Sequence, residues 1–437
     1  MIDDTGTENP APNVSDVNME QRFEPGGITI DYALIITERK PPLDIKSLIV
    51  EVLLFEDIFC PFITGKIVLM DSTALTAILP LVGEETIFLR MHTPGPSGDK
   101  FKREGEFVLY KMEARENAKL KCLTYELCFT SIEAVTDANQ KISKTYRGKI
   151  SDSVKQLLTT IPGLNTNKET VVEETSNIDV HTSNFWTPTK NIYFLSGRAV
   201  NGVSNPCFLF FENRQGFIFA SLDNLVKNDP IQAFSVDSKM RKAGEQQNID
   251  EEYGKVLDMS TPVLYDYFDR LETGFYGSSV YWFDIITKKL SFKYLMAKDH
   301  ITKNSLNAYP ISKDLVALPH SLVKTKIWHH DLYNGQPDLE ATHDNKRMAI
   351  LAQADTLKTN IRVFGRLDYT VGNTINLTIY KATSSDKTET TDQDIDEVMS
   401  GKYLITAIGH EITPSNHYCN IELCKDTVIK EFKKEVQ

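Results

Sequence analysis

The chain has 437 residues, 41% hydrophobic and 25% charged, which is the composition of a folded protein with about two to four domains. Its formal net charge of −12 at pH 7 excludes a protein whose main task is to grip nucleic acid, because phosphate binding needs clustered lysine and arginine. Six widely spread cysteines exclude a disulfide framework, and no apolar run approaches the roughly 20 residues that span a membrane.

Residues 1–24 are predicted to form an N-terminal arm. The segment contains Pro10, Pro12 and several Asn and Asp residues but few aromatic side chains, so it buries too little apolar area to order itself. Two interpretations stay open, a disordered tail and a segment that docks on a partner. The arm lacks the basic flank and apolar centre of a secretion signal, so synthesis in a cytoplasm is expected.

Residues 25–135 are predicted to be a first β domain. Runs rich in β-branched and aromatic residues alternate with Pro and Gly, the pattern of successive short antiparallel strands in a barrel or sandwich. Asp71-Ser72 predicts one capped helical turn between two of these strands. The strands are expected at residues 28–37, 47–55, 66–71, 86–91, 106–112 and 119–131.

Residues 136–240 are predicted to be an α/β middle domain, to which residues 299–342 are expected to return. Apolar residues at helical spacing follow Ser151 and Thr187-Pro188, so a helix is expected after each. The apolar run from Cys207 to Phe211, a turn ending at Gly216 and the run from Phe217 to Phe219 predict a β-hairpin.

Residues 241–298 and 343–428 are assigned to a second β domain, and 429–437 to a C-terminal tail. Thr261-Pro262 is expected to begin a helix that ends at Gly274, and a second helix is expected over 344–358. A hairpin is expected at 280–292, and residues 382–400 are predicted to be a solvated polar loop. Further strands are expected at 362–364, 374–380, 402–411 and 418–425.

The first and last thirds contain an internal repeat. A strand, a Val-Gly turn, a Thr-Ile strand, an aromatic-headed strand and a Glu-Leu-Cys strand follow one another in the same order in both. The clearest traces are Val82-Gly83 with Val371-Gly372 and Glu126-Leu127-Cys128 with Glu422-Leu423-Cys424. Three copies of a chain with two similar domains would present six similar units, the geometry of an adaptor between threefold and sixfold objects.

In the order of these motifs the chain resembles the baseplate hub proteins of contractile-tailed bacteriophages of the T-even kind, and the head of type VI secretion spikes. The resemblance covers most of the chain. It is carried by Asp71-Ser72 before Val82-Gly83, by Phe185-Trp186-Thr187, by the hairpin 208–219, by residues 348–354 before Val371-Gly372, and by residues 403–412 with His410-Glu411.

The resemblance implies an α+β, mainly β fold with two tandem tube-like antiparallel β-barrel domains and an α/β domain between them. It implies a homotrimer that forms a pseudo-sixfold ring around a DNA channel in the tail baseplate of a virion. The implied partners are the central spike protein and the tail tube or tube-initiator protein, with the tape-measure protein and baseplate wedge components as further possibilities. No sequence-specific binding of nucleic acid is implied. The arm 1–24 and the loop 382–400 depart from the family.

Four patterns that resemble ligand sites each lack an essential residue, so no catalytic, cofactor-binding or metal-binding residue is predicted. Gly95 to Lys100 lacks the spacing of a phosphate-binding loop, and Asp392, Asp394 and Asp396 lack the Gly and Glu of a calcium loop. His410-Glu411 lacks the second His of a zinc protease motif, because Pro414 stands there. The group His320, His329, His330 and His343 lacks metal-ligand spacing.

A non-enzymatic structural hub is therefore the first hypothesis, and two alternatives stay open. One is a tail-associated peptidoglycan hydrolase with a pair of acids in the middle domain. The other is a receptor- or glycan-binding module in which Trp186, Trp282 and Trp328 line an exposed site, although core packing explains these residues more simply.

Overall fold

A computed structural model describes residues 24–38, 40–73, 75, 79, 81–95, 98–119, 122–202, 205–236, 249–263, 266–296, 305–310, 322–328, 337–381 and 395–430. The predicted arm, apart from Glu24, lies outside these ranges, as do most of the predicted helical turn after Asp71 and residues 382–394 of the predicted loop. The C-terminal tail is described only at Ile429 and Lys430.

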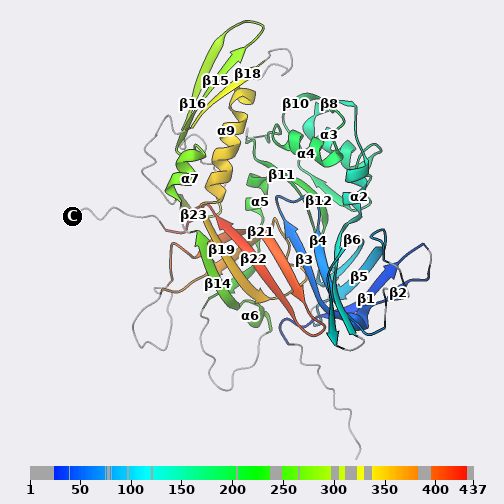
Figure 1. Cartoon of the computed structure of the whole chain (residues 1–437). Helices are drawn as coiled ribbons and strands as arrows, with labels where there is room; N and C mark the ends of the chain where they lie inside the picture. The colour runs from blue at the N-terminus through cyan, green and yellow to red at the C-terminus, as the bar shows by residue number, and fades with distance from the viewer. Residues whose placement is uncertain are drawn as a thin grey trace, which may run out of the picture.

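The chain is mainly β, and most of its strands form one 13-stranded sheet (Figure 1). Hydrogen bonds order the sheet as β14-β19-β22-β21-β3-β4-β7-β6-β5-β1-β2, while β20 also pairs with β21 and β13 with β20. Its strands are β1 Thr29–Ile36, β2 Leu43–Asp44, β3 Ile49–Asp57, β4 Thr64–Asp71, β5 Thr86–His92, β6 Lys102–Lys119, β7 Cys122–Ser131, β13 Pro230–Ser235, β14 Val256–Val263, β19 Leu357–Phe364, β20 Thr374–Thr378, β21 Gly401–Ile412 and β22 His417–Lys425.

The internal repeat is visible in the strand order. β3, β4, β7, β6 and β5, all in the first third, are neighbours in that order, and β14, from the middle third, with β19, β22, β21 and β20 of the last third are neighbours in the corresponding order. All of these pairs are antiparallel. We call these two sets the first unit and the last unit.

The two units also agree in register. Ile87 pairs with Phe107 in the first unit, and Ile375 pairs with Tyr403 in the last. Counting from these pairs, the β-bulge between Leu109 and Lys111 and the bulge between Ile405 and Ala407 fall at the same position of the two strands. Gly83 and Gly372, in the two Val-Gly turns, both have positive φ angles, of 92° and 82°.

A strand pair within the chain joins the two units. β21 of the last unit pairs antiparallel with β3 of the first, from Ala407 opposite Asp57 to Ile412 opposite Val52. The sheet therefore continues without a break from one unit to the other. Alternate side chains in both units are buried, among them Val52, Leu54, Ile408 and Ile412. Since alternate side chains of a strand point to the same face, each unit buries one face of the sheet.

The middle of the chain packs over one end of the sheet as smaller sheets with helices (Figure 1). The hairpin of β11 and β12 pairs in parallel with β9, and β8 pairs with β10. A core of ring and aliphatic side chains fills the space between these elements, among them Phe208, Phe210, Phe217 and Phe219. The bounds are β8 Thr145–Lys149, β9 Glu169–Val172, β10 Ile178–Thr182, β11 Phe208–Asn213, β12 Gly216–Ser221, α2 Ile132–Asn139, α3 Ile150–Thr159, α4 Pro188–Ser196 and α5 Leu222–Lys227.

A three-stranded sheet, β16-β15-β18, projects from the body beside helix α9 (Figure 1). Its strands are β15 Gly277–Asp284, β16 Leu290–Met296 and β18 Leu322–Trp328, and α9 spans Pro337–Ala354. Sequence analysis assigned 277–296 to the second β domain and 322–328 to the middle domain. The structure instead pairs these strands with one another, because β18 lies parallel to β15 from residue 278 onward.

Two further predictions in this region were wrong. Residues 256–263 form strand β14, and the helix predicted from Thr261-Pro262 begins only at α7 Tyr267–Glu272, where the Asp266 side chain caps it. Pro262 is tolerated because β14 is an edge strand whose register shifts between Ser260 and Val263. Residues 230–235, assigned to the middle domain, form β13 and pair with β20. The remaining elements are η1 Lys46–Leu48, η2 Asp99–Phe101, α6 Ile249–Tyr253, β17 Tyr309–Pro310 and β23 Thr427–Val428.

Candidate functional site: the joint between the units

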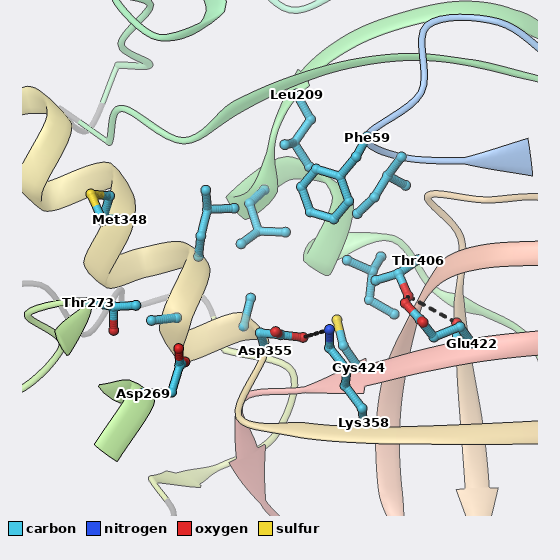
Figure 2. Close-up of a pocket in the computed structure, with 16 residues that line it drawn as sticks. Phe59, Leu209, Asp269, Thr273, Met348, Asp355, Lys358, Thr406, Glu422 and Cys424 are labelled. Atoms are coloured by element: carbon cyan, nitrogen blue, oxygen red, sulfur yellow. Dashed lines mark hydrogen bonds and ion pairs between the residues drawn. The ribbon is translucent and has the colours of Figure 1, made fainter. Parts of the chain in front are cut away.

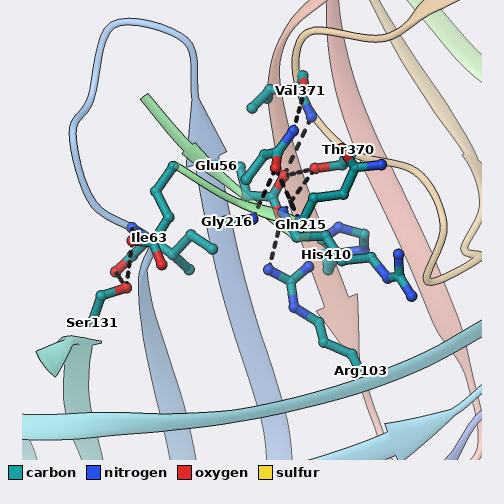
Figure 3. A network of polar contacts seen from close by, with 12 residues as sticks. Glu56, Ile63, Arg103, Ser131, Gln215, Gly216, Thr370, Val371 and His410 are labelled. Atoms are coloured by element: carbon teal, nitrogen blue, oxygen red, sulfur yellow. Dashed lines mark hydrogen bonds and ion pairs between the residues drawn. The ribbon is translucent and has the colours of Figure 1, made fainter. Parts of the chain in front are cut away.

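A buried carboxylate, Glu56, links both units where β3 meets β21. Its side chain is fully buried, and one oxygen accepts a hydrogen bond from Arg103 Nη2 at 2.6 Å. The other oxygen accepts from the Thr370 hydroxyl and, at 3.3 Å, from the Val371 backbone N–H (Figure 3). Arg103 is the second residue of β6, whereas Thr370 and Val371 precede β20, so the Glu56 side chain on β3 links three separate segments.

The tip of the β11–β12 hairpin is inserted into the same joint. The Arg214 guanidinium donates to the carbonyls of Asp99 at 2.6 Å and Lys102 at 3.1 Å, both in the first unit. The backbone N–H of Arg214 donates to the Thr370 hydroxyl at 3.2 Å, in the last unit. Burial lowers the pKa of Arg214, and the neighbouring charge of Arg103 acts in the same direction. Through Arg214, the middle segment therefore contacts both the first and the last unit and links them.

A second buried acid, Glu212, attaches the hairpin to the first unit close to its turn, where Glu212 pairs with Phe217. One of its oxygens accepts from the Ile63 N–H at 3.0 Å and from the Ser131 hydroxyl at 2.6 Å. The other accepts from Lys168 Nζ at 2.7 Å, which also donates to Glu133 at 2.7 Å. Burial raises the pKa of Glu212 even though Lys168 opposes the change. Both carboxylate oxygens of Glu212 are therefore occupied by contacts that hold the hairpin in place.

An apolar pocket of about 300 Å³ lies between α9, the hairpin and the last unit (Figure 2). Phe59, Leu209 and Met348 line it, and Asp355 forms an ion pair of 3.0 Å with Lys358 at its edge. Cys424 also lines it, but burial raises the pKa of this thiol strongly, so it is held protonated and is a poor nucleophile. Thr406 and Glu422 also line the pocket, and the Thr406 hydroxyl donates to the Glu422 carboxylate at 2.7 Å (Figure 2).

The face of the sheet opposite the two cores, which we call the open face, crosses the joint with mixed charges. Glu51, Glu126 and Glu411 lie close together on it, since Glu51 and Glu126 both lie opposite Val68 and Glu411 lies opposite Leu53. Burial first, and then the charges of Glu411 and Glu126, raise the pKa of Glu51. Two of these acids form ion pairs on the same face, Glu126 with Lys66 at 3.1 Å and Glu411 with Arg362 at 2.9 Å.

The tryptophans do not gather into one site. Trp282 is buried at 7% exposure, and half-buried Trp186 packs against His181 and Phe194 with ring centroids 5.7 and 5.3 Å apart. The side chain of Trp328 lies outside the described residues.

The other candidate patterns are only partly described. His343 is buried in α9, while His320, His329 and His330 lie outside the described residues. Asp392 and Asp394 lie outside them too, and Asp396 accepts hydrogen bonds from the N–H groups of Val398 and Met399. Of the stretch from Gly95 to Lys100, residues 96 and 97 are not described, and Asp99 begins the short helix η2 before β6.

Sequence analysis missed Glu56, Arg103 and Glu212. One signal was available for Glu56, because Val52, Leu54 and Glu56 alternate along β3 and the strand period places all three on the buried face. No local pattern marks Arg103 as the partner of Glu56. None marks Glu212 either, since Glu212 contacts Ile63 across 149 residues.

The duplicated strand unit, the joint and the inserted hairpin define the chain as a protein with the fold of bacteriophage tail proteins. Two solved structures share this fold over nearly their whole length. The tail protein from Neisseria meningitidis MC58 matches with a TM-score of 0.54 and 10% identity, over 92% of this chain and 97% of that one. The 43 kDa tail protein of prophage MuSo2 from Shewanella oneidensis matches with a TM-score of 0.55 and 6% identity, over 91% and 99%.

The resemblance to tail proteins that the order of motifs indicated is thereby confirmed at the level of fold. No family model matches the sequence, and a search of the curated proteins found no match. None of the described helices is both long enough and apolar enough to cross a bilayer.

Proposed function

We propose that the chain is a structural hub of a phage-type tail baseplate, a homotrimer that adapts a sixfold tail tube to a threefold central spike. The observation that carries this proposal is the pairing of β3 with β21. That pairing places two similar units side by side in one continuous sheet, as two of six positions around a ring. The likeness in fold to two tail proteins supports the same conclusion.

The free edge of β6 and the free edge of β14 can pair between protomers as β21 and β3 pair within the chain. In the described residues β5 pairs with β6 only up to Val108, so the following part of β6, to Lys119, is bonded on its β7 side alone. At the other end β14 pairs only with β19. Exposed strand edges of this kind are templates for pairing with another chain. Because β6 corresponds to β21 and β14 to β3, the β21–β3 joint is the template for a contact between protomers.

The repeat also predicts the register of that contact. Glu411 lies opposite Leu53 in the internal joint. Glu116 corresponds to Glu411: Glu116 pairs with Thr124 and Glu411 pairs with Tyr418, and each partner lies five residues before the equivalent residue Phe129 or Leu423. Ser260 corresponds to Leu53: Leu53 pairs with Lys66, which lies opposite Cys128, and Ser260 pairs with Asn360, which lies opposite Glu422, the counterpart of Cys128. Glu116 of one protomer is therefore expected opposite Ser260 of the next.

Cysteine cross-linking tests the trimer and its register together. Directly opposed residues in antiparallel strands have Cα atoms roughly 4.5–5.5 Å apart, within the range that a disulfide bridges. The double variant Glu116→Cys with Ser260→Cys is expected to give a covalent trimer under mild oxidation, seen on a non-reducing gel.

Controls for this experiment are the two single variants and a pair with Glu116→Cys and Lys190→Cys, because Lys190 lies in the middle segment away from both edges. A native mass equal to one chain would overturn the hub. A trimer that forms no cross-link would overturn only the β6–β14 contact.

In this role the chain acts by shape rather than catalysis, and its place is the baseplate of a virion assembled in the host cytoplasm. Its proposed partners are the spike, the tail tube or tube initiator, the tape-measure protein and the baseplate wedges. The hydrolase alternative needs an acid pair in the middle segment, and Lys168 lies between Glu133 and Glu212. Clearing of a cell-wall suspension by the purified chain would favour that alternative.

A further inference from the structure

Two histidines and a cysteine meet in the buried interior of the β21–β22 hairpin. His410 on β21 lies directly opposite Cys419 on β22, and His417, two residues before Cys419, lies on the same face. His410 Nδ1 is 3.0 Å from His417 Nε2, and Cys419 Sγ is 3.3 Å and 3.5 Å from these two nitrogens. All three side chains are at most 1% exposed.

The spacing of these three atoms matches one face of a tetrahedral metal site. Zinc bonds of about 2.0–2.1 Å to nitrogen and 2.3 Å to sulfur place neighbouring ligand atoms about 3.3–3.6 Å apart, close to the three distances seen. Hydrogen bonding alone gives less reason for this arrangement, because two contacts are enough to link three groups, whereas here each atom contacts both others.

The surroundings are arranged to hold the rings in place. Gly365 packs against the His417 ring so closely that a Cβ there would lie 2.3 Å from the ring carbons. The Gly365 N–H donates to the His417 carbonyl, and the His417 N–H donates to the carbonyl of Gly26, each at 2.7 Å. The β21–β22 hairpin, Gly365 at the end of β19 and Gly26 in the segment before β1 therefore come together at the cluster.

We propose that His410, His417 and Cys419 bind one thiophilic d¹⁰ cation, Zn²⁺ in the first instance, as a structural clamp at the joint between the units. Binding exchanges the Cys419 thiol proton for the metal, which leaves a thiolate and two neutral imidazoles as ligands and releases one proton. A water molecule completes four-coordination. The Arg103 charge nearby opposes a cation, but Glu56 pairs with it at 2.6 Å.

The proposal extends beyond the hub function and does not depend on it. Metal analysis of the full chain, purified without a histidine tag, tests it directly. We expect about one zinc per chain, and Cys419→Ser is expected to lower zinc affinity tenfold or more. The matched control is Cys424→Ser, a buried cysteine on the same strand that has no histidine contact among the described residues. It should keep the metal.

A measurement on the unaltered chain keeps the test decisive if Cys419→Ser fails to fold. Replacing zinc by Co²⁺ should give the near-ultraviolet thiolate band and the visible bands of tetrahedral cobalt, and X-ray absorption should show one sulfur and two imidazole nitrogens. One copper per chain would assign the site to Cu⁺ instead. A folded chain that takes up none of these ions would overturn the proposal, and so would equal metal loss in both variants.

Discussion

At the scale of single residues, buried acids join segments that are far apart in the sequence. Glu212 shows how this is achieved: it lies on β11 but accepts hydrogen bonds from Ile63, Ser131 and Lys168. Its pKa is raised by burial, whereas the pKa of Lys168 is raised because Glu212 and Glu133 together outweigh the effect of burial. Lys168 therefore neutralises two acids that burial would otherwise penalise.

Removing that cation should make stability depend on pH. We expect Lys168→Met to lower the Tm at pH 7 by about 5 °C or more, because it removes the cation that is ion-paired with the buried carboxyl groups of Glu133 and Glu212. A raised carboxyl pKa means that the folded state takes up protons more readily than the unfolded state, so the deficit should shrink between pH 7 and pH 5.

Thermal unfolding across this pH range measures the effect. Lys149→Met, which removes an exposed pair with Glu174, serves as control and should leave the Tm nearly unchanged. A deficit that stays constant with pH would contradict the explanation.

At the scale of elements, the β11–β12 hairpin contacts both units at the joint. Its residue Gly216 lets strand β9 approach and pair with β12. Gly216 has a φ of 143°, and a Cβ there would lie 2.1 Å from the carbonyl oxygen of Glu169 on β9. Gly98 has a similar φ of 123° but no atom within 4 Å of its Cβ position. Substitution of Gly98 therefore measures the free energy of backbone strain alone, and substitution of Gly216 measures strain together with a steric clash.

We expect Gly216→Ala to destabilise the chain by about 3 kcal/mol, because it adds displacement of β9 to the strained φ. Gly98→Ala should cost only about 1 kcal/mol, from φ alone. Urea unfolding gives both values, and proteolysis should cut the middle segment faster in the first variant. Equal costs would show that β9 does not restrict the hairpin.

At the scale of the whole molecule, the proposed ring would turn the open face of the sheet toward a channel through which DNA slides. A channel should not hold phosphates, and on this face Lys66 and Arg362 are ion-paired while Glu51, Glu126 and Glu411 lie near one another. Because Glu126 holds Lys66 and Glu411 holds Arg362, these two cations would bind the passing phosphates only weakly.

Introducing cations on this face should slow DNA ejection. We expect particles with Glu51→Lys or Glu411→Lys to assemble but to eject DNA more slowly at low salt, and high salt should reduce the difference. Glu51→Gln tests the loss of charge alone, and Asp152→Lys, on the exposed side of α3, tests a cation elsewhere. Unchanged ejection by both lysine variants would contradict a channel role for this face.

The sequence by itself determined what depends on neighbours along the chain. Strand alternation and the Val-Gly turns were sufficient to predict the duplicated unit, because these patterns are local and their order survives the loop after β20. The Glu-Leu-Cys motifs lie on the corresponding strands β7 and β22 but two residues out of register, since the counterpart of Leu423 is Phe129. The same patterns predicted the β11–β12 hairpin and the helices α3 and α4.

Tertiary structure decided how these parts meet. The Thr261-Pro262 pair indicates a helix start in isolation, but an edge strand accommodates it through a shift in register. Glu56 reaches Thr370 across 314 residues, and His410 meets Cys419 only because β21 and β22 pair in one particular register. Contacts between strands depend on strand register and on loop closure, and the local residue pattern determines neither.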